Sequence, residues 1–457
     1  MSKHTKKPTK KNRWIYLPIE SKNRELHSRI LIGIEGAKRG YNVVIAGKNK
    51  LRKILNNYPP GLVFFKDHAT DSTNKFMLDA KDKMHQIALL DEESFVLHPD
   101  EIFKKVRVNK PATEIIDHAF FLGNRHIDLY KRIKALSLLN SYSISGNPRF
   151  DLTRPKLREN YKNDVLRLKK KYGKFILINT HFAQGNHADG SGGFLWRVKK
   201  NGFFNDLEIK NYYTQISDER AKLFKHYKEE VIPLLASKFP DLKIIIRTHP
   251  EENDKTYKVI SKVYKNVIVI HEGSVHPWIL ASESVIHSGC TTGTEAFALG
   301  KKSIFYNPIG LKYIGISNIE INNKFKLIKA LKYKIKTDGK KNNKVNVLKD
   351  AIANYDDSYA YISILDTIDK MQLDTEIRFN SNFTIFTIIK LFIIEEFTYL
   401  IRNVKYFFVK RNMARSGRKK FNNLRSSEVK KILDPLASCI NVNFNLSVKN
   451  IGPDSVL

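Results

Sequence analysis

Short apolar runs alternate with helical patterns along most of this chain, and no other feature of the sequence constrains the fold as strongly. Residues 14–19 read as a strand, residues 24–39 as a helix that ends at Gly40, and residues 42–46 as the next strand. The pattern continues to a strand at residues 142–145. Strands that are separated by helices in this way predict a parallel, doubly wound sheet.

The same alternation begins again in the second part of the chain. Residues 175–179, 242–247 and 267–270 are apolar runs with helical patterns between them, and 457 residues are enough for two domains and an appendage. We therefore predict an α/β fold of two doubly wound, Rossmann-like domains that face a cleft. The expected divisions are a disordered basic tail at 1–13, a first domain at 14–150, a second domain at 151–335 and a helical, basic extension at 336–457.

Three further segments carry local predictions. The polar, glycine-rich run at 184–193 predicts a mobile loop that closes over a ligand. Residues 318–380 look helical and polar, and the C-terminal end of the chain looks weakly structured.

The formal net charge of +34 favours anionic partners. Lysine and asparagine are abundant everywhere while arginine-rich tracts are missing, so we expect phosphorylated ligands and no nucleic acid. Cys290 and Cys439 cannot build a disulfide framework or a four-thiolate metal site, which favours a reducing compartment. The basic start lacks the apolar segment of a secretory signal, so we expect a cytoplasmic protein.

The most apolar late segment is 383–401. It contains Lys390, Glu395 and Glu396, and its uninterrupted apolar pieces are too short to cross a bilayer. Basic residues follow at 410–425. Two interpretations stay open: an amphipathic element on the acidic inner face of the cell membrane, or a helix packed on the protein with a solvated tail.

Polar groups directly follow the apolar run at 242–247. Arg247 ends the run and His249 comes two residues later, so both belong to the carboxyl end of a buried strand. His249 is either a ligand-binding group or a histidine that caps a helix or lies in the core.

A second polar turn joins the apolar residues at 285–286 to a helix that ends at Gly300. A strand, a Gly/Ser/Thr turn and a helix start leave backbone N–H groups able to bind an anion, although the turn could be a tight connection only. Glu295, in the helix, could accept hydrogen bonds from a ribose diol or cap the helix start. The turn residues expected at a diphosphate are Ser288, Gly289, Thr291, Thr292 and Gly293.

Several ordered motifs together resemble the bacterial surface carbohydrate biosynthesis protein family. They are YLPIESKNREL (16–26), ALLDEES (88–94), GNPRFDLTRP (146–155), FILINTHF (175–182), RTHPEEN (247–253), HEGSVHPW (271–278) and HSGCTTGTEAFALGKK (287–302). This family resembles two-domain transferases of the GT-B type and, distantly, CDP-glycerol glycerophosphotransferases. The resemblance implies the assembly of capsule, O-antigen or similar glycans.

The resemblance also implies a division of labour between the two halves. The second half is expected to hold a nucleotide-activated sugar or polyol donor, with Arg247 and His249 near the phosphates and Glu295 on the ribose. The first half is expected to hold a glycan or lipid-linked acceptor beside Lys22, Arg24 and Glu25, although Lys22 and Arg24 could equally be solvated charges.

Acidic residues at strand ends of the first half are candidates for a general base. Glu20 follows the first strand, and Asp91 and Glu92 end another strand on the same edge, where α/β sheets place their ligands. A positioned carboxylate there could deprotonate an acceptor hydroxyl, and His249 completes the candidate catalytic set. The residues Asn147, Arg149 and Asp151 are interpreted as a structural hinge.

No cofactor and no metal are expected. His271, His276 and His287 lack the spacing and companions of zinc motifs. The favoured function is a metal-independent transferase of bacterial surface polysaccharide synthesis. A nucleotide-sugar epimerase or hydrolase on the same scaffold and a non-catalytic scaffold at the membrane are the alternatives.

Overall fold

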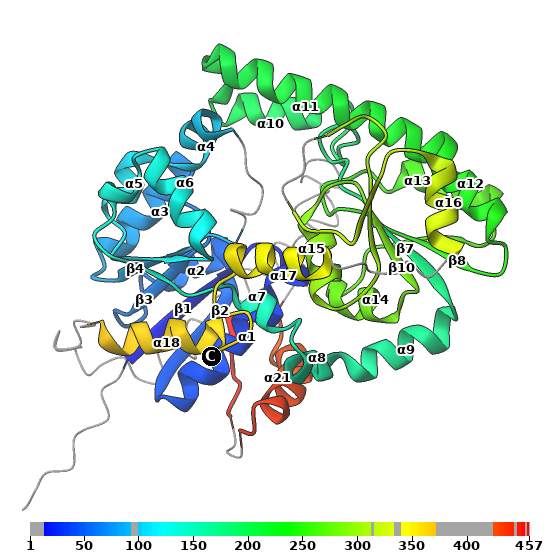
Figure 1. Ribbon diagram of the computed structural model, residues 1–457. Helices are drawn as coiled ribbons and strands as arrows, with labels where there is room; N and C mark the ends of the chain where they lie inside the picture. The colour runs from blue at the N-terminus through cyan, green and yellow to red at the C-terminus, as the bar shows by residue number, and fades with distance from the viewer. Residues whose placement is uncertain are drawn as a thin grey trace, which may run out of the picture.

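The structure, a computed structural model, has two lobes, each built on one sheet (Figure 1). The residues that it describes are 13–92, 99–311, 315–332, 340–371, 424–442, 446–452 and 455–456.

The first lobe contains a sheet with the strand order β13-β14-β2-β1-β3-β4-β5-β6. Strands β1 to β6 pair in parallel, as the alternation of strands and helices predicts. Ile15, Tyr16 and Leu17 on β1 are completely buried, since helices cover the sheet on both faces. The strands are β1 (Arg13–Ile19), β2 (Tyr41–Gly47), β3 (Leu62–Phe65), β4 (Gln86–Leu90), β5 (His118–Phe121), β6 (Tyr142–Ile144), β13 (Asn450–Gly452) and β14 (Ser455–Val456).

The helices of this lobe follow its strands. Residue types at the ends explain some of the boundaries: the Thr70 hydroxyl accepts a hydrogen bond from the Thr73 N–H and caps α3, and Gly40, with a φ of 83°, follows α1. The helices are α1 (Lys22–Lys38), α2 (Lys48–Ile54), α3 (Asp71–Lys81), α4 (Asp100–Arg107), α5 (Lys110–Glu114), α6 (Asn124–Arg132) and a 3-10 turn at Leu136–Leu138.

The second lobe contains a parallel sheet with the order β12-β11-β10-β7-β8-β9. Its central strand β7 is buried along its whole length. The strands are β7 (Phe175–Asn179), β8 (Lys243–Arg247), β9 (Val267–Ile270), β10 (Ser284–His287), β11 (Ser303–Tyr306) and β12 (Ile319–Ile321). Residues 319–321 were predicted as helical, and this prediction is wrong because their pairing with β11 is a tertiary contact.

Two groups of helices lie between and around the lobes. The first connects them and consists of α7 (Pro148–Asp151), α8 (Pro155–Arg158), a 3-10 turn (Glu159–Tyr161) and α9 (Lys162–Tyr172). The second belongs to the second lobe and consists of α10 (Gly193–Lys200), a 3-10 turn (Phe203–Asn205), α11 (Leu207–His226), a π-helical turn (Tyr227–Val231), α12 (Ile232–Lys238), α13 (Lys255–Val263), α14 (Val275–Ala281), α15 (Thr291–Ala298) and α16 (Lys324–Lys332).

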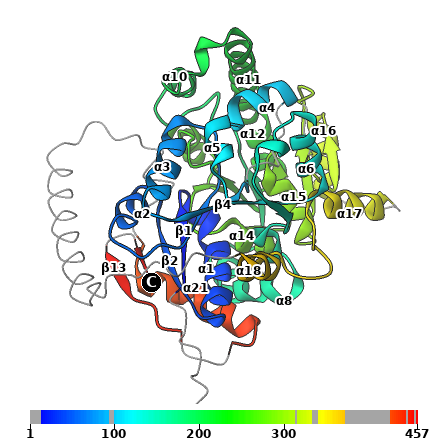
Figure 2. The same ribbon diagram turned by 90° about the vertical axis from the view of Figure 1, so that its left-hand side faces the viewer.

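The described C-terminal elements return to the first lobe (Figure 2). Helices α18 (Ala360–Lys370) and α21 (Ser426–Cys439) pack against α1, and β14 pairs antiparallel with β2 at the edge of the sheet. Helix α17 (Lys340–Ala351) contacts α6. The helices α17 and α18 agree with the helical pattern predicted for 318–380, but the prediction of a weakly structured C-terminal end is wrong for α21, β13 and β14. Their order comes from packing against distant parts of the chain, which local propensity does not report.

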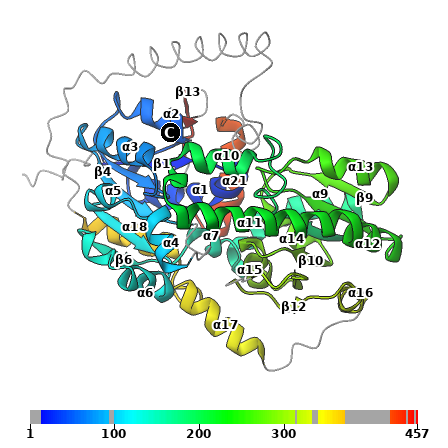
Figure 3. The ribbon, with the colours of Figure 1, turned by 90° about the horizontal axis from the view of Figure 1, so that it is seen from above.

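Helices α10 and α11 extend from the second lobe over the space between the lobes, toward α4 (Figures 1 and 3). We call residues 193–213 the roof hairpin. Ile209 of the hairpin packs with Ile102 and Val106 of α4. The Lys105 Nζ of α4 lies 2.8 Å from a carboxylate oxygen of Asp206 of the hairpin. The lobes therefore touch at the roof hairpin as well as at the connecting helices.

The run at 184–193, which was predicted as a mobile lid, is bonded to the segment after β8. The Ala188 N–H donates to the Glu251 carbonyl at 2.7 Å, and the Asn253 N–H donates to the Asn186 carbonyl at 3.0 Å. Asn186 and His187 are buried. The prediction of a mobile loop is wrong, because the backbone N–H and C=O groups of this run pair with the segment after β8, whereas those of a free loop would bond to water.

Among the described residues, no helix is long and apolar enough to span a membrane. The apolar segment at 383–401, the basic residues of 410–423 and the tail at 1–12 lie outside the described residues.

Candidate functional site

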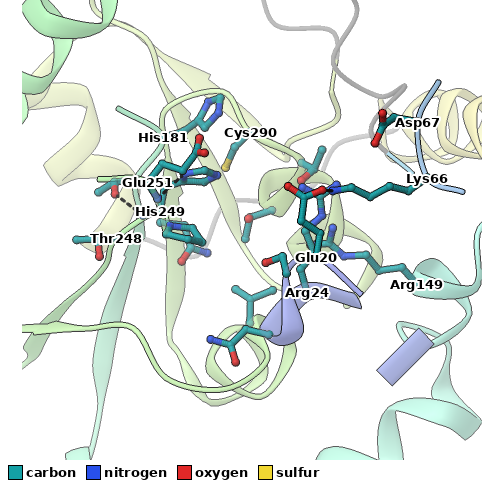
Figure 4. Close-up of a pocket in the computed structure, with 18 of the residues that line it drawn as sticks. Glu20, Arg24, Lys66, Asp67, Arg149, His181, Thr248, His249, Glu251 and Cys290 are labelled. Carbon is teal, nitrogen blue, oxygen red and sulfur yellow. Dashed lines mark hydrogen bonds and ion pairs between the residues drawn. The ribbon is translucent and has the colours of Figure 1, made fainter. Parts of the chain in front are cut away.

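A cavity of about 560 Å³ lies between the two lobes (Figure 4). Its walls are the segments that follow the strands at their carboxyl ends, where parallel sheets place ligands. Val106 and Arg107 of α4, with Phe203 and Tyr213 of the roof hairpin, also line it. Of the predicted site residues, those that line the cavity are Glu20, Arg24, Arg247, His249, Thr291 and Thr292.

The second-lobe wall begins at the ends of β7 and β8. Asn179 and Thr248 line the cavity and are almost completely buried. The Asn179 Nδ2 and the Thr248 Oγ1 have no hydrogen-bond partner among the residues that the structure describes. Buried donors are nearly always paired in folded proteins, so these two atoms mark a place where a ligand is expected to bind.

Two histidines lie together on this wall. His181 follows β7, His249 follows β8, and their ring centroids are 5.4 Å apart with the planes 69° from parallel. Burial, with the charges of Arg220, His249 and Arg24, holds the pKa of His181 well below its ordinary value, so its imidazole is neutral near pH 7. The His249 Nδ1 accepts a hydrogen bond from the Glu251 N–H at 3.3 Å.

Arg247 lines the cavity, but two of its donors point to the loop after β9. Its guanidinium donates to the carbonyl of Glu272 at 2.6 Å and to that of Gly273. Burial lowers the pKa of Arg247 to about 10, against the opposing effect of Glu272 and then Glu295. These bonds fix the end of β8 beside the next strand. A contact between Arg247 and phosphates remains a prediction.

The turn before α15 presents only part of the predicted set to the cavity. Cys290, Thr291 and Thr292 line it, and they lie at the N-terminus of α15, where the helix dipole favours anions. Gly289, with a φ of 85°, makes the turn without lining the cavity. Ser288 is completely buried.

Gly293 is required for packing. A Cβ at this position would lie 2.3 Å from the imidazole of His287, so only glycine fits over that ring. Direct phosphate contacts of Ser288 and Gly293, which the motif suggested, are therefore corrected: both residues support the turn from beneath.

Glu295 does not line the cavity. Its Oε1 lies 2.7 Å from the Arg149 Nη2 and its Oε2 lies 2.9 Å from the His276 Nε2, and the carboxylate is completely buried. Burial alone would raise its pKa, but Arg149 and then His276 outweigh it and lower the pKa of Glu295 to about 2. The predicted ribose contact is corrected, because no part of this carboxylate is open to a ligand.

Arg149, interpreted from the sequence as a hinge residue, lines the cavity. Its guanidinium also forms the ion pair with the buried carboxylate of Glu295. Its neighbours fit the hinge interpretation: the Asn147 Oδ1 accepts from the Arg149 N–H at 2.9 Å, and Asp151 accepts from the N–H groups of Ala360 and Tyr361 at the start of α18.

On the first-lobe wall, Glu20 lines the cavity and Asp91 and Glu92 do not. Asp91 is buried 2.7 Å from the Arg107 Nη2, and Glu92 is buried 3.3 Å from the Arg29 Nη2. Both are corrected as candidate bases, because each carboxylate is buried, is paired with an arginine and does not line the cavity.

Lys66 links the remaining acidic residues of this wall. Its Nζ lies 2.8 Å from Glu20 and 3.4 Å from Glu25, and Figure 4 shows the Glu20 and Lys66 side chains meeting in the cavity. Glu25 is buried and accepts a hydrogen bond from the Glu20 N–H at 2.7 Å. Lys22 points away and lies 3.0 Å from Glu428 of α21. The acceptor contacts predicted for Glu25 and Lys22 are therefore corrected, and Arg24 alone of that set lines the cavity.

Sequence reasoning missed several residues that line the cavity. Most of them directly follow a strand, as the predicted residues do, so the same positional rule could have found them. They are Lys48, Lys66, Asp67, Asn179, Thr180, His181, Thr248, Glu251 and His271. Within the described ranges, no group of three histidine, cysteine or acidic side chains is placed to hold a metal ion.

Two Rossmann-like lobes with a cavity between them define the GT-B fold, and comparisons with known proteins agree with this assignment. The sequence matches no family model. It matches no curated protein either.

Solved structures share the fold at low identity. UDP-GlcNAc 2-epimerase of Methanocaldococcus jannaschii, in complex with UDP-GlcNAc and UDP, is 15% identical with a TM-score of 0.52, over 78% of this chain and 99% of that chain. MnaA of S. aureus with UDP is 14% identical with a TM-score of 0.50, over 78% and 96%. A variant of the wall teichoic acid polymerase TagF with CDPG is 14% identical with a TM-score of 0.50, over 80% and 90%.

Proposed function

We propose that this chain is an enzyme that binds a nucleotide-activated sugar or polyol in the cavity. In this proposal it transfers the sugar or polyol phosphate to a glycan or lipid-linked acceptor of bacterial surface polysaccharide synthesis, such as capsule or O-antigen. One observation carries the proposal: the second-lobe wall places two buried donors, on Asn179 and Thr248, that have no partner in the described part of the chain beside the helix start at Thr291 and Thr292. Such a wall suits a diphosphate.

The chemistry follows from the placement of charge. The start of α15, with Arg24 and Arg149 on the facing side, would stabilise the negative charge that develops on the departing nucleotide, which is electrostatic catalysis. Glu20 would take the proton of the attacking acceptor hydroxyl, since it is the predicted carboxylate that reaches the cavity. The Lys66 Nζ, 2.8 Å from the Glu20 carboxylate, would hold that carboxylate in position.

A second candidate is a nucleotide-sugar epimerase. The epimerase from Methanocaldococcus jannaschii aligns over 99% of its own length, including both lobes. The first lobe would then hold the sugar of the same nucleotide instead of a separate acceptor.

The two candidates are separated by product analysis with a labelled donor. We first expect CDP or UDP to raise the melting temperature of the protein, because a ligand that binds only the folded state stabilises it. If the protein then changes the free sugar nucleotide without any acceptor, the epimerase is correct. If the label moves only when a glycan acceptor is present, the transferase is correct. No stabilisation by any nucleotide would contradict both.

A further inference from the structure

The outer face of the roof hairpin is not explained by the cavity beneath it. Its inner side packs within the protein: Gly193 and Val198 of α10 are buried, and Phe203 and Tyr213 line the cavity. Its outer side carries the large apolar side chains of Trp196, 57% exposed, and Leu207, 68% exposed. The other two tryptophans of the chain, Trp14 and Trp278, are buried.

Two lysines of α10 lie on the same helix face as the exposed indole of Trp196. Lys199 and Lys200 follow Trp196 by three and four positions, so they share its face of α10, and the Lys200 Nζ lies 5.0 Å from the centroid of the Trp196 ring. Both lysines are exposed. The acidic neighbours Asp206 and Glu208 are paired with Lys105 of α4, at 2.8 and 2.7 Å. The outer face of α10 is therefore both aromatic and positively charged.

We propose that this face of α10 docks on an anionic membrane surface, with the Trp196 indole in the headgroup layer and Lys199 and Lys200 on the lipid phosphates. Tryptophan is suited to that layer because its ring is apolar and its N–H is polar. Lysines add attraction to anionic lipids over the distance of a Debye length. A single short helix gives weak, reversible binding, which fits a face with one indole and two lysines.

Docking through the outer face of α10 would bring the cavity close to a membrane. Within residues 193–213, Phe203 and Tyr213 line the cavity, while Trp196, Lys199 and Lys200 are exposed and do not line it. Docking would hold the cavity next to the headgroup layer, within reach of an acceptor that is attached to a lipid. The docking itself does not depend on which reaction the cavity performs.

Trp196 provides a direct probe, because it is the exposed one of three tryptophans. The full chain is mixed with vesicles of phosphatidylcholine, with and without phosphatidylglycerol. With phosphatidylglycerol we expect a blue shift of the tryptophan emission and quenching by brominated acyl chains. Phosphatidylcholine alone is expected to give neither. Sedimentation with the anionic vesicles without any change in emission would overturn the proposal, because it would place the contact elsewhere; so would the absence of sedimentation.

Charge reversal tests the lysines. Lys199→Glu with Lys200→Glu is expected to lower the affinity for anionic vesicles at least about tenfold, since each lysine near such a surface contributes about fivefold. The matched control is Lys326→Glu with Lys329→Glu on α16, two exposed lysines near Phe325, which is itself 71% exposed. An equal loss in both double variants would show that only the net charge of the protein matters and would overturn the assignment to α10. Thermal melts of all variants check the fold.

Discussion

The two walls of the cavity are built from different kinds of groups. On the first-lobe wall three cations have a nearby carboxylate: Lys66 with Glu20 at 2.8 Å, Lys48 with Asp67 at 3.6 Å, and Arg107 with Asp91 at 2.7 Å. Arg24 also lines this wall. The second-lobe wall offers hydroxyls, imidazoles, a helix start and two buried donors without a protein partner among the described residues.

This difference indicates what each wall can bind. A wall on which most cations already face a carboxylate attracts an anion less strongly, but its fixed donors and acceptors can orient a neutral polyhydroxylated molecule. A wall with unused donors at a helix start gains most from an anion, because the bond to a charged group is the stronger one. The comparison therefore supports the part of the proposed function that places the nucleotide on the second lobe and the acceptor hydroxyl on the first.

The largest expected effect concerns Glu20 on the first-lobe wall and distinguishes a loss of catalysis from a loss of nucleotide binding. Glu20→Gln keeps the size of the side chain but removes the basic carboxylate, so we expect turnover to fall about 10²- to 10⁴-fold. Nucleotide affinity, measured by calorimetry on the same variant, is expected to stay unchanged. A fall in nucleotide affinity large enough to account for the lost activity would contradict the placement of the nucleotide on the second-lobe wall.

The second effect concerns the support beneath the second-lobe wall. Glu295→Gln leaves Arg149 and His276 without their buried carboxylate, and we expect about 3 kcal/mol less stability at pH 7 in urea unfolding. The pKa of Glu295 lies near 2 in the fold, against 4.5 for a free carboxyl. Its contribution is therefore complete above pH 4.5 and is lost as the pH falls toward 2, so the two unfolding curves should converge there. A constant difference over this range would contradict the ion pairs.

The third effect tests the anion-binding turn. Thr291→Val with Thr292→Val removes two hydroxyls that line the cavity. We expect nucleoside diphosphate affinity to fall at least about tenfold, because even one hydrogen bond to a charged group contributes about 1.5 to 3 kcal/mol. The matched control is Ser288→Ala, which removes a buried hydroxyl of the same turn. Equal losses in the control and the threonine variant would show that the shape of the turn, and not its hydroxyls, governs binding.

The smallest effect tests a corrected residue. Lys22 pairs with Glu428 near the surface, so Lys22→Ala is expected to cost less than about 1 kcal/mol of stability. Turnover and the KM for the acceptor should stay the same. A clear rise in the acceptor KM would restore the acceptor contact that the sequence suggested for this residue.

Residues at strand ends show how far sequence reasoning reaches. Glu20 and His249 were found because an apolar run stops just before them, and Thr291 because it belongs to the polar turn between a strand and a helix. All three line the cavity. Asp91 satisfies the same rule, yet it is buried beside Arg107. The rule gives the end of a strand, but the direction of a side chain there depends on partners from other elements.

The sequence by itself determined the two α/β halves and the edge of each sheet that borders the cavity, because strand and helix periodicity and strand ends are local patterns. The tertiary structure decided which polar groups face the cavity, how Glu295 is paired, and that β14 joins the first sheet. It also decided that the roof hairpin reaches α4. Each of these depends on contacts between residues far apart in the chain, and local sequence patterns do not predict such contacts.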